Sequence, residues 1–401
     1  MTNIYAALEI GTTRTVLAVG EAETGGRLRI TAHAETPSVG VRKSQVTDIA
    51  QTTQSIRNVL KHIGQRADGK PQQSTITIGN AFLIVSGQHV KVTSTSSSVP
   101  IGRDKVRDEE IKAVFDHTRM IPIPKDRELL DIADQDYAID GRGGIVSPKG
   151  MSGGTLQLNI LQIHAEANRI NDARSAAEDA RLEIREPLFA ATCAADAVLD
   201  DTERREGVLL LDLGGGSTGY AVYSDGYLAD AGVIGVGGDH VTNDIATAFQ
   251  TTQQQAETLK INDASAVLSP EDNATARVSI AGSSTLAERT ISRRALDTVV
   301  NARVRELLKI IRTTLEENDL LHRLHSGVVI TGGGAALKGI DLLISRELGL
   351  NVRIGRPIGI DGLDAEPHNE SFAAIAGALI YAHRNYEEKP ILDSILRKFF
   401  K

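Results

Sequence analysis

The chain has 401 residues, too long for one ordinary hydrophobic core, so we expect two or more domains. Hydrophobic residues make up 41% and charged residues 24% of the sequence, as in soluble folded proteins, and the net charge of −8 argues against nucleic-acid binding. A single cysteine, Cys193, and no secretory segment after Met1 predict a cytoplasmic location. No apolar run reaches the roughly 18 residues of a membrane-spanning helix, so any membrane contact is expected to be peripheral.

The first candidate motif joins two strands predicted over residues 6–8 and 15–19, with a third strand predicted over 28–33. The first strand delivers Glu9, and the turn after it contains Gly11, Thr12 and Thr13. Taken alone, an acid and a glycine at this place are more typical of an ordinary strand end than of a ligand site.

The next part of the chain contains a predicted helix over 49–63 and a strand over 74–85. Residues 85–164 differ from the preceding part in composition and pattern. They contain a serine and threonine run that we interpret as a polar strand, a charged helix over 108–118 and a strand over 156–164. We interpret this block as an inserted subdomain. Helices over 169–182 and 188–199 follow, and Glu186 between them is a candidate for orienting water near a metal ion.

The most informative stretch is GVLLLDLGGGSTGYAVY, residues 207–223. A buried strand over 208–211 ends at Asp212, and a glycine turn joins it to two further strands, the last over 227–233. The turn contains Gly214, Gly215, Gly216, Ser217 and Thr218.

Because these glycines connect strands and no Gly-Lys-Ser/Thr follows them, a P-loop or a dinucleotide fingerprint is disfavoured. Backbone N–H groups and hydroxyls in such a turn can still hold phosphate, and Asp212 can hold Mg²⁺ through water. A glycine bulge without a ligand is the alternative. However, Glu9-Ile10-Gly11 recurs as Asp212-Leu213-Gly214, and the repeated hairpin predicts two related lobes that face one nucleotide.

In the following segment Gly237 and Gly238, which we predict to bind the nucleotide, precede a helix over 241–249. Glu257 and Lys260 stand at i, i+3 on the next helix. By spacing alone the last two form an intrahelical contact, although the pair would also suit a ribose. We expect strands and turns over 262–285 and a long helix over 291–317. Its arginines form a solvated face unless an acidic partner exists.

A third glycine group follows a buried strand over 328–330, at Gly332, Gly333 and Gly334. We expect these glycines to open a helix over 337–348 and to approach an adenosine or its phosphates, with a tight structural turn as the alternative. An apolar helix over 371–381 is expected to lie in the core.

The last eleven residues are predicted to form an amphipathic helix. At about 100° per residue, its apolar half contains Ile391, Leu392, Ile395, Leu396, Phe399 and Phe400, and its polar half includes Arg397, Lys398 and Lys401. We favour an interfacial membrane helix over a core helix, because it is terminal and its cations flank two phenylalanines.

Three glycine-containing motifs, in the order LEIG, LDLGGGST and ITGGGA, resemble the phosphate and adenosine motifs of the actin and heat-shock chaperone ATPase superfamily. Within it the chain is similar to the FtsA family over nearly its whole length, including DYAIDGRGGIVSPKGMSG in the insert, GGDHVTNDIA, and GGGAALKGI. The resemblance implies an α/β fold with two related ribonuclease-H-like lobes and an FtsA-type inserted subdomain.

The resemblance also implies a domain plan. The first-lobe core would comprise residues 1–84, 165–205 and about 366–386, with the insert at 85–164. The second lobe would comprise a core at 206–236 and 310–365 and an outer subdomain at 237–309. A short linker and the terminal helix would occupy 387–401.

By the same resemblance, the three glycine motifs bind ATP, and Glu9 and Asp212 hold Mg²⁺ through water. Glu257 and Lys260 would face the ribose. The protein would be at most a slow ATPase. FtsA proteins polymerise, bind the C-terminal tail of FtsZ and attach it to the cytoplasmic face of the membrane at the division site. Arg289 and Arg303 match basic contacts to that tail, and other division proteins are further partners.

Family members commonly have a long linker before the terminal helix, whereas only residues 385–389 intervene here. Because so short a linker limits the reach of the helix, docking on the body of the protein is the alternative to membrane binding. A sugar kinase and a pilus-assembly platform protein are alternative functions.

Overall fold

The computed structural model describes residues 3–23, 27–63, 78–102, 105–268, 276–280, 282 and 288–386. The predicted terminal helix, with Ile391, Leu392, Ile395, Leu396, Arg397, Lys398, Phe399, Phe400 and Lys401, lies outside these residues. No helix within the described ranges is both long and apolar enough to cross a membrane.

The first lobe is built on a six-stranded sheet with the order β11-β6-β1-β2-β3-β19. Its first three strands form an antiparallel meander, and β6 and β11 add in parallel beside β1. The strands are β1 (Ile4–Ile10), β2 (Arg14–Ala22), β3 (Leu28–Pro37), β6 (Asn80–Val85), β11 (Glu183–Phe189) and β19 (Ile360–Asp361). Helices α1 (Ile49–Ile63) and α3 (Ala167–Asp179) pack against each other in this lobe. A small hairpin, β4 (Val41–Arg42) and β5 (Gln45–Val46), precedes α1.

The second lobe repeats this plan in a five-stranded sheet with the order β14-β13-β12-β17-β18. Again three strands form an antiparallel meander, and two parallel strands extend the sheet beside the first of them. The strands are β12 (Val208–Leu213), β13 (Thr218–Ser224), β14 (Tyr227–Ile234), β17 (Val328–Thr331) and β18 (Val352–Ile354). The two sheets confirm the predicted α/β fold of two related lobes.

The outer part of the second lobe is mainly helical. It contains α6 (Gly238–Ala248), α7 (Gln253–Asn262), α8 (Arg293–Glu317), α9 (Ile340–Leu348) and the hairpin β15 (Arg277–Ile280) with β16 (Arg289–Ser292). Apolar residues of α6, α8 and α9 form one core with one face of the sheet, including Leu209, Leu211 and Ile330.

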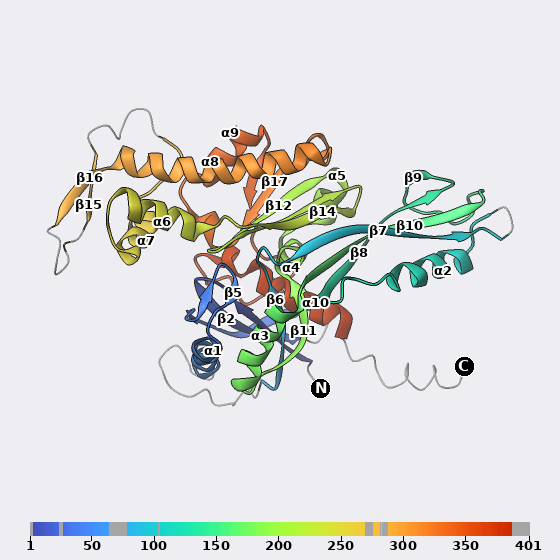
Figure 1. Ribbon diagram of the computed structural model, residues 1–401, viewed down its shortest axis with the longest axis horizontal. Helices are drawn as coiled ribbons and strands as arrows, with labels where there is room; N and C mark the ends of the chain where they lie inside the picture. The colour runs from blue at the N-terminus through green and yellow to red at the C-terminus, as the bar shows by residue number, and fades with distance from the viewer. Residues whose placement is uncertain are drawn as a thin grey trace.

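Residues 91–166 form a separate layer that extends sideways from the two lobes (Figure 1). Its sheet has the order β7-β10-β8-β9, and helix α2 (Asp108–Arg119) packs on β7 and β10. The strands are β7 (Lys91–Pro100), β8 (Arg127–Ile139), β9 (Arg142–Ile145) and β10 (Thr155–Glu166). The serine and threonine run lies in β7 and pairs with β10, as predicted for a polar strand. Gln135 donates hydrogen bonds to the carbonyls of Leu228 and Ala229, so the insert also touches the second lobe.

Two helices of small residues, α4 (Ala190–Val198) and α10 (Ala373–Tyr386), lie between the two large sheets (Figure 1). Helix α10 packs on β1, β2 and β6, and α4 packs on β12 and β13. The two helices touch at Gly377, where an added Cβ would overlap the carbonyl oxygen of Cys193. This contact brings the lobes into one shared core.

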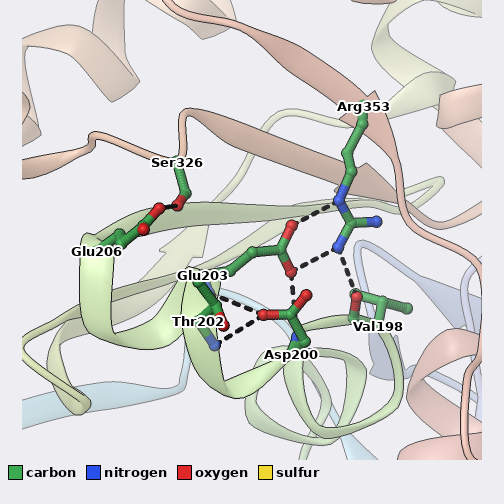
Figure 2. A network of polar contacts seen from close by, with 7 residues as sticks. All are labelled: Val198, Asp200, Thr202, Glu203, Glu206, Ser326 and Arg353. Atoms are coloured by element: carbon green, nitrogen blue, oxygen red, sulfur yellow. Dashed lines mark hydrogen bonds and ion pairs between the residues drawn. The ribbon is translucent and has the colours of Figure 1, made fainter.

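The chain crosses from the first lobe to the second through α5 (Asp201–Glu206), which a polar network holds in place (Figure 2). Asp200 caps the helix by accepting hydrogen bonds from the backbone of Thr202 and Glu203. Arg353 of β18 forms a bidentate pair with Glu203 at 2.6 and 2.7 Å and also donates to the carbonyl of Val198, at the end of α4.

Several predicted helix starts differ from the structure by two or three residues, and three of them have a clear local reason. The helix predicted from residue 188 begins at Ala190, because β11 continues to Phe189. The helix predicted from residue 291 begins at Arg293, because residues 289–292 pair with β15. The glycines at 332–334 do not open an α-helix. Gly333 and Gly334 begin a 3-10 turn, Gly333–Ala336, and α9 begins only at Ile340 after Gly339, whose φ of 72° is left-handed.

We predict that Gly377→Ala lowers the free energy of unfolding by about 3 kcal/mol, because a methyl group at this backbone contact forces α10 away from α4. Urea unfolding measures the change. Gly79→Ala is the matched control, since nothing lies within 4 Å of an added Cβ there. Equal stability of the two variants would show that the helices tolerate separation.

Candidate functional site

A cavity of about 710 Å³ opens between the two lobes, within the size range of small-molecule sites. Every nucleotide-binding residue predicted from the sequence lines it: Glu9, Gly11, Thr12, Thr13, Asp212, Gly214, Gly215, Gly216, Ser217, Thr218, Gly237, Gly238, Glu257, Lys260, Gly332, Gly333 and Gly334. Segments more than 300 residues apart in the sequence therefore meet in one cleft.

The two predicted phosphate turns have equivalent geometry. Gly11 donates its N–H to the carbonyl of Arg14 at 3.0 Å, and Gly214 donates to the carbonyl of Ser217 at 3.0 Å. An added Cβ would lie 2.8 Å from the first carbonyl oxygen and 2.9 Å from the second, so each turn needs a glycine at this place. The sequence repeat therefore reflects a repeated local structure.

The turns also face each other across the cleft. An added Cβ on Gly215 would overlap the hydroxyl of Thr13, and one on Gly216 would overlap the hydroxyl of Thr12. The absence of side chains lets the lobes approach, so two threonine hydroxyls from one lobe meet the glycine backbone of the other. Such a set of hydroxyls and exposed backbone is suited to anion binding.

Two carboxyl groups lie beside these turns, each on the second-to-last residue of the strand before it, Glu9 of β1 and Asp212 of β12. The pKa of Asp212 is raised to about 7, mainly by burial and further by the negative charge of Glu9, while the positive charge of Arg14 opposes both effects. Burial also raises the pKa of Glu9, again opposed by Arg14. The carboxylate charges are therefore poorly compensated by the protein itself, which favours a cation ligand.

The third glycine group packs on the second phosphate strand. An added Cβ on Gly332 would overlap the carboxylate of Asp212, and one on Gly334 would lie 2.8 Å from the Cβ of Leu213. Gly332 has a left-handed φ of 81°, while Gly333 has open space beside it. A flat ligand group can thus approach the backbone at Gly333.

The predicted pair on α7 forms an ion pair inside the cleft. Lys260 Nζ lies 2.7 Å from Glu257 Oε2 and 2.9 Å from the hydroxyl of Thr242. It also donates to the carbonyl of Gly238 at 3.2 Å, which ties α7 to the start of α6. The pair is both an intrahelical contact and part of the cavity wall.

Two predicted residues are not in the cleft. The Glu186 carboxylate accepts hydrogen bonds from Tyr381 and Tyr386 of α10, at 3.1 and 2.6 Å, and does not line the cavity, so it is not placed to orient water there. Arg289 donates to the carbonyls of Phe249 and Gln250. Its guanidinium holds the end of α6.

Arg303, the second predicted partner contact, does line the cavity. Its guanidinium forms a bidentate pair with Asp244 at 2.6 and 3.0 Å and contacts Glu306 at 2.5 Å. An acidic partner must therefore compete with two carboxylates of the same subdomain for this arginine.

Sequence reasoning missed several polar residues of the cleft, including Ser44, Ser86, Asp239 and Arg14. Ser44 and Ser86 contact Ser217, Asp239 donates its N–H to the carbonyl of Gly215, and Arg14 reaches from β2 to the carbonyl of Ser371. Ser44, Ser86 and Arg14 lie outside the glycine motifs, whereas Asp239 directly follows Gly237 and Gly238 and could have been included. Only the pairing of distant segments places Ser44 and Ser86 here, although Arg14 follows the first turn directly and could also have been included.

The donor set fits a magnesium nucleotide. Backbone N–H groups and hydroxyls suit phosphate oxygens, and one or two carboxylates suffice for Mg²⁺, which keeps several waters and takes phosphate ligands. Among the described residues no cluster of three or more histidine, cysteine, aspartate or glutamate side chains could hold a metal ion. A metal bound here would therefore depend on the ligand's own oxygens.

We predict that the raised pKa of Asp212 makes stability depend on pH. The folded protein binds this proton more tightly than the unfolded chain, so the stabilising contribution is complete below the ordinary value of 3.8 and is lost as the pH rises to about 7. Asp212→Asn should therefore raise the thermal unfolding midpoint more at pH 8 than at pH 5, without nucleotide or divalent cations. An equal difference at both pH values would contradict this.

The fold is shared with several solved structures. The chain superposes on the PilM-PilN type IV pilus biogenesis complex with a TM-score of 0.62 at 19% identity, covering 94% of this chain and 98% of that one. Superposition on MreB 5 of Spiroplasma citri bound to AMPPNP gives a TM-score of 0.52 at 16% identity, with 99% of each chain covered. These similarities establish an actin-like fold.

The sequence comparisons are more specific. The family described as cell division protein FtsA matches residues 209–377, and the SHS2 domain inserted in FtsA matches residues 87–164. The cell division protein FtsA of Pseudomonas aeruginosa is 31% identical over 94% of this chain and 89% of its own length. That of Escherichia coli K12 is 29% identical, over 98% of this chain and 94% of its own length. The chain therefore belongs to the FtsA family of cell division proteins.

Proposed function

We propose that this protein binds Mg-ATP in the cleft between its lobes, polymerises, and tethers FtsZ filaments to the inner face of the cytoplasmic membrane. The observation that carries the nucleotide part is the convergence of two equivalent glycine turns, each preceded by a half-buried acid, in one cavity of about 710 Å³. A cavity shared by both lobes lets a ligand stabilise their closed arrangement, because it contacts the two sides at once.

Within this site each group has a separate role. The turns at Gly11–Thr13 and Gly214–Thr218 hold phosphate oxygens, and Gly332–Gly334 accepts the adenosine. Glu257 and Lys260 face the ribose. Asp212 and Glu9 hold Mg²⁺ through water, and the metal neutralises phosphate charge when bound.

We propose that the protein is at most a slow ATPase. Of the three acids predicted to position a water molecule, Glu9 and Asp212 line the cavity, whereas Glu186 is held by two tyrosines outside it. In this proposal ATP serves mainly to close the cleft and support polymerisation. The protein acts as a nucleotide-dependent adaptor.

Self-association is supported by the fold. The chain superposes on the MamK double helical filament with a TM-score of 0.51 at 11% identity, covering 94% of this chain and 98% of that one. We propose that actin-like filaments of this protein present many copies of one FtsZ-binding surface. Other cell-division proteins then bind the inserted subdomain.

For FtsZ, we propose that its acidic and apolar tail docks on residues 237–309, with Arg289 and Arg303 as cationic contacts. Both arginines are already bonded within the subdomain, Arg303 to Asp244 and Glu306 and Arg289 to backbone carbonyls. Docking therefore exchanges internal partners for the carboxylates of the tail. Because internal contacts are lost, we expect one copy of the protein to bind one tail with modest affinity. A polymer that binds many tails at once binds more tightly.

The membrane contact is assigned to residues 391–401, with the apolar half of the helix in the lipid interface and Arg397, Lys398 and Lys401 near the headgroups. So short an anchor binds weakly by itself. Many anchors on one filament bind together.

We predict that Asp212→Ala weakens Mg-ATP binding at least about tenfold, because the water shell of the metal loses its main carboxylate. Isothermal titration calorimetry measures the affinity. Asp361→Ala removes an exposed carboxylate of β19 outside the cavity and should leave it unchanged. Full affinity in the Asp212 variant would reject this assignment.

We predict that Ile395→Gln reduces sedimentation with anionic liposomes several-fold, because it places an amide on the apolar face of the terminal helix. Its neighbour on the polar face provides the control: Ser394→Gln introduces the same side chain and should sediment normally. Deletion of residues 391–401 should abolish sedimentation and spare nucleotide binding. Unchanged sedimentation of the truncated protein would reject the proposal that residues 391–401 attach the protein to the membrane.

A further inference from the structure

The tip of hairpin β4–β5 has an unusual backbone. Its two loop residues, Lys43 and Ser44, have left-handed φ values of 49° and 60°. A two-residue loop of this kind normally carries asparagine and glycine, because other side chains are strained there. Strained residues of this type persist where surrounding contacts fix them, and they cluster at ligand sites.

The surrounding contacts of Ser44 come from both phosphate turns. Its N–H donates to the hydroxyl of Thr12 at 2.7 Å, and its own hydroxyl lies 3.3 Å from that of Thr12. The same hydroxyl lies 3.2 Å from that of Ser217 in the second lobe. Ser217 is buried, and its hydroxyl is also 3.4 Å from that of Ser86, at the end of β6. Four hydroxyl groups thus form a chain across the cleft.

The hairpin tip also fits closely against the second turn. An added Cβ on Gly216 would lie 3.0 Å from the Cα of Lys43 and 3.2 Å from the nitrogen of Ser44. Ser44 and the two residues after it line the cavity. The tip is therefore a third wall of the phosphate site, formed by a segment that contains no glycine motif.

The position of this wall indicates which phosphate it reaches. The glycines at 332–334 pack on Asp212 and Leu213, before the second turn, whereas Ser44 packs on Gly216 and Ser217, at its end. A nucleotide that lies with its adenosine at Gly332–Gly334 extends its phosphates along the turn toward Ser44. The last phosphate of a triphosphate lies nearest to the hairpin.

We propose that Ser44 is a specificity-determining residue that selects a nucleoside triphosphate over a diphosphate. This inference rests on the proposed nucleotide-binding function. In the bound state the hydroxyl and N–H of Ser44 give up their hydrogen bonds to Thr12 and Ser217. They donate instead to oxygens of the terminal phosphate. The exchange is favourable because a hydrogen bond to a charged oxygen is stronger than one between neutral hydroxyls. A diphosphate does not extend to the hairpin and leaves the hydroxyl chain as it is.

Ser44→Gly tests this directly, since glycine suits the left-handed turn, keeps the N–H and removes the CH₂OH side chain with its hydroxyl. We expect its affinity for Mg-AMPPNP, a slowly hydrolysed triphosphate, to fall about tenfold while its affinity for Mg-ADP stays within about twofold. The thermal unfolding midpoint should not fall. Ser44→Ala should show the same loss of selectivity.

The matched control is Asp225→Gly, which makes the same kind of change at the tip of hairpin β13–β14, where φ is 56° and the residue is outside the cavity. Both affinities should be unchanged. An equal loss for the two nucleotides, or no loss, in the Ser44 variants overturns the inference. Wild-type protein that binds neither nucleotide would instead overturn the proposed function.

Discussion

The backbone contact between α4 and α10 is the constraint on which the arrangement of the lobes depends. Helix α10 packs on the first sheet, α4 packs on the second, and Gly377 lets the two helices touch at the carbonyl of Cys193. Residues from both sheets, such as Leu17 and Leu210, consequently belong to one hydrophobic core. The lobes are joined at this core, and the cleft that contains the glycine turns opens between them. A change in their relative orientation must therefore act through these two helices.

The electrostatics of the cleft follow from this geometry. Each sheet delivers an acid at the end of its first strand, and the joined lobes bring both acids into one buried site. Arg14 opposes the raised pKa of both carboxyls, but burial outweighs it and takes the pKa of Asp212 to about 7. A divalent cation accompanied by phosphates supplies the missing positive charge and the oxygen ligands together. Without a ligand, burial in this site raises the pKa of both carboxyls.

Local patterns predicted the glycine turns well, because a turn that needs glycine leaves that glycine in the sequence. The repeat of Glu9-Ile10-Gly11 as Asp212-Leu213-Gly214 was enough to predict two related lobes. Helix starts were less predictable, since pairing with β15 extends a strand to Ser292 where helical spacing had already begun. The family resemblance, rather than spacing, supplied the ribose and partner residues.

Contacts between distant segments could not be predicted in this way. Glu186 follows a plausible pattern for a catalytic acid, yet two tyrosines about 200 positions later hold its carboxylate. Ser44 has no motif around it and reaches the cleft only because hairpin β4–β5 folds onto Gly216. The sequence thus contains the groups that need special backbone geometry, whereas the polar partners brought in by folding become visible only in the structure.

Hydrogen–deuterium exchange of the full chain with and without Mg-ATP tests the central claim most directly, because it reports on both lobes in one experiment. The account predicts nucleotide-dependent protection at three separate segments, around Gly11, around Gly215 and around Gly333, with little change in the outer strand β9 of the insert. Protection confined to one lobe, or none at the glycine turns, would contradict a shared nucleotide site between the lobes.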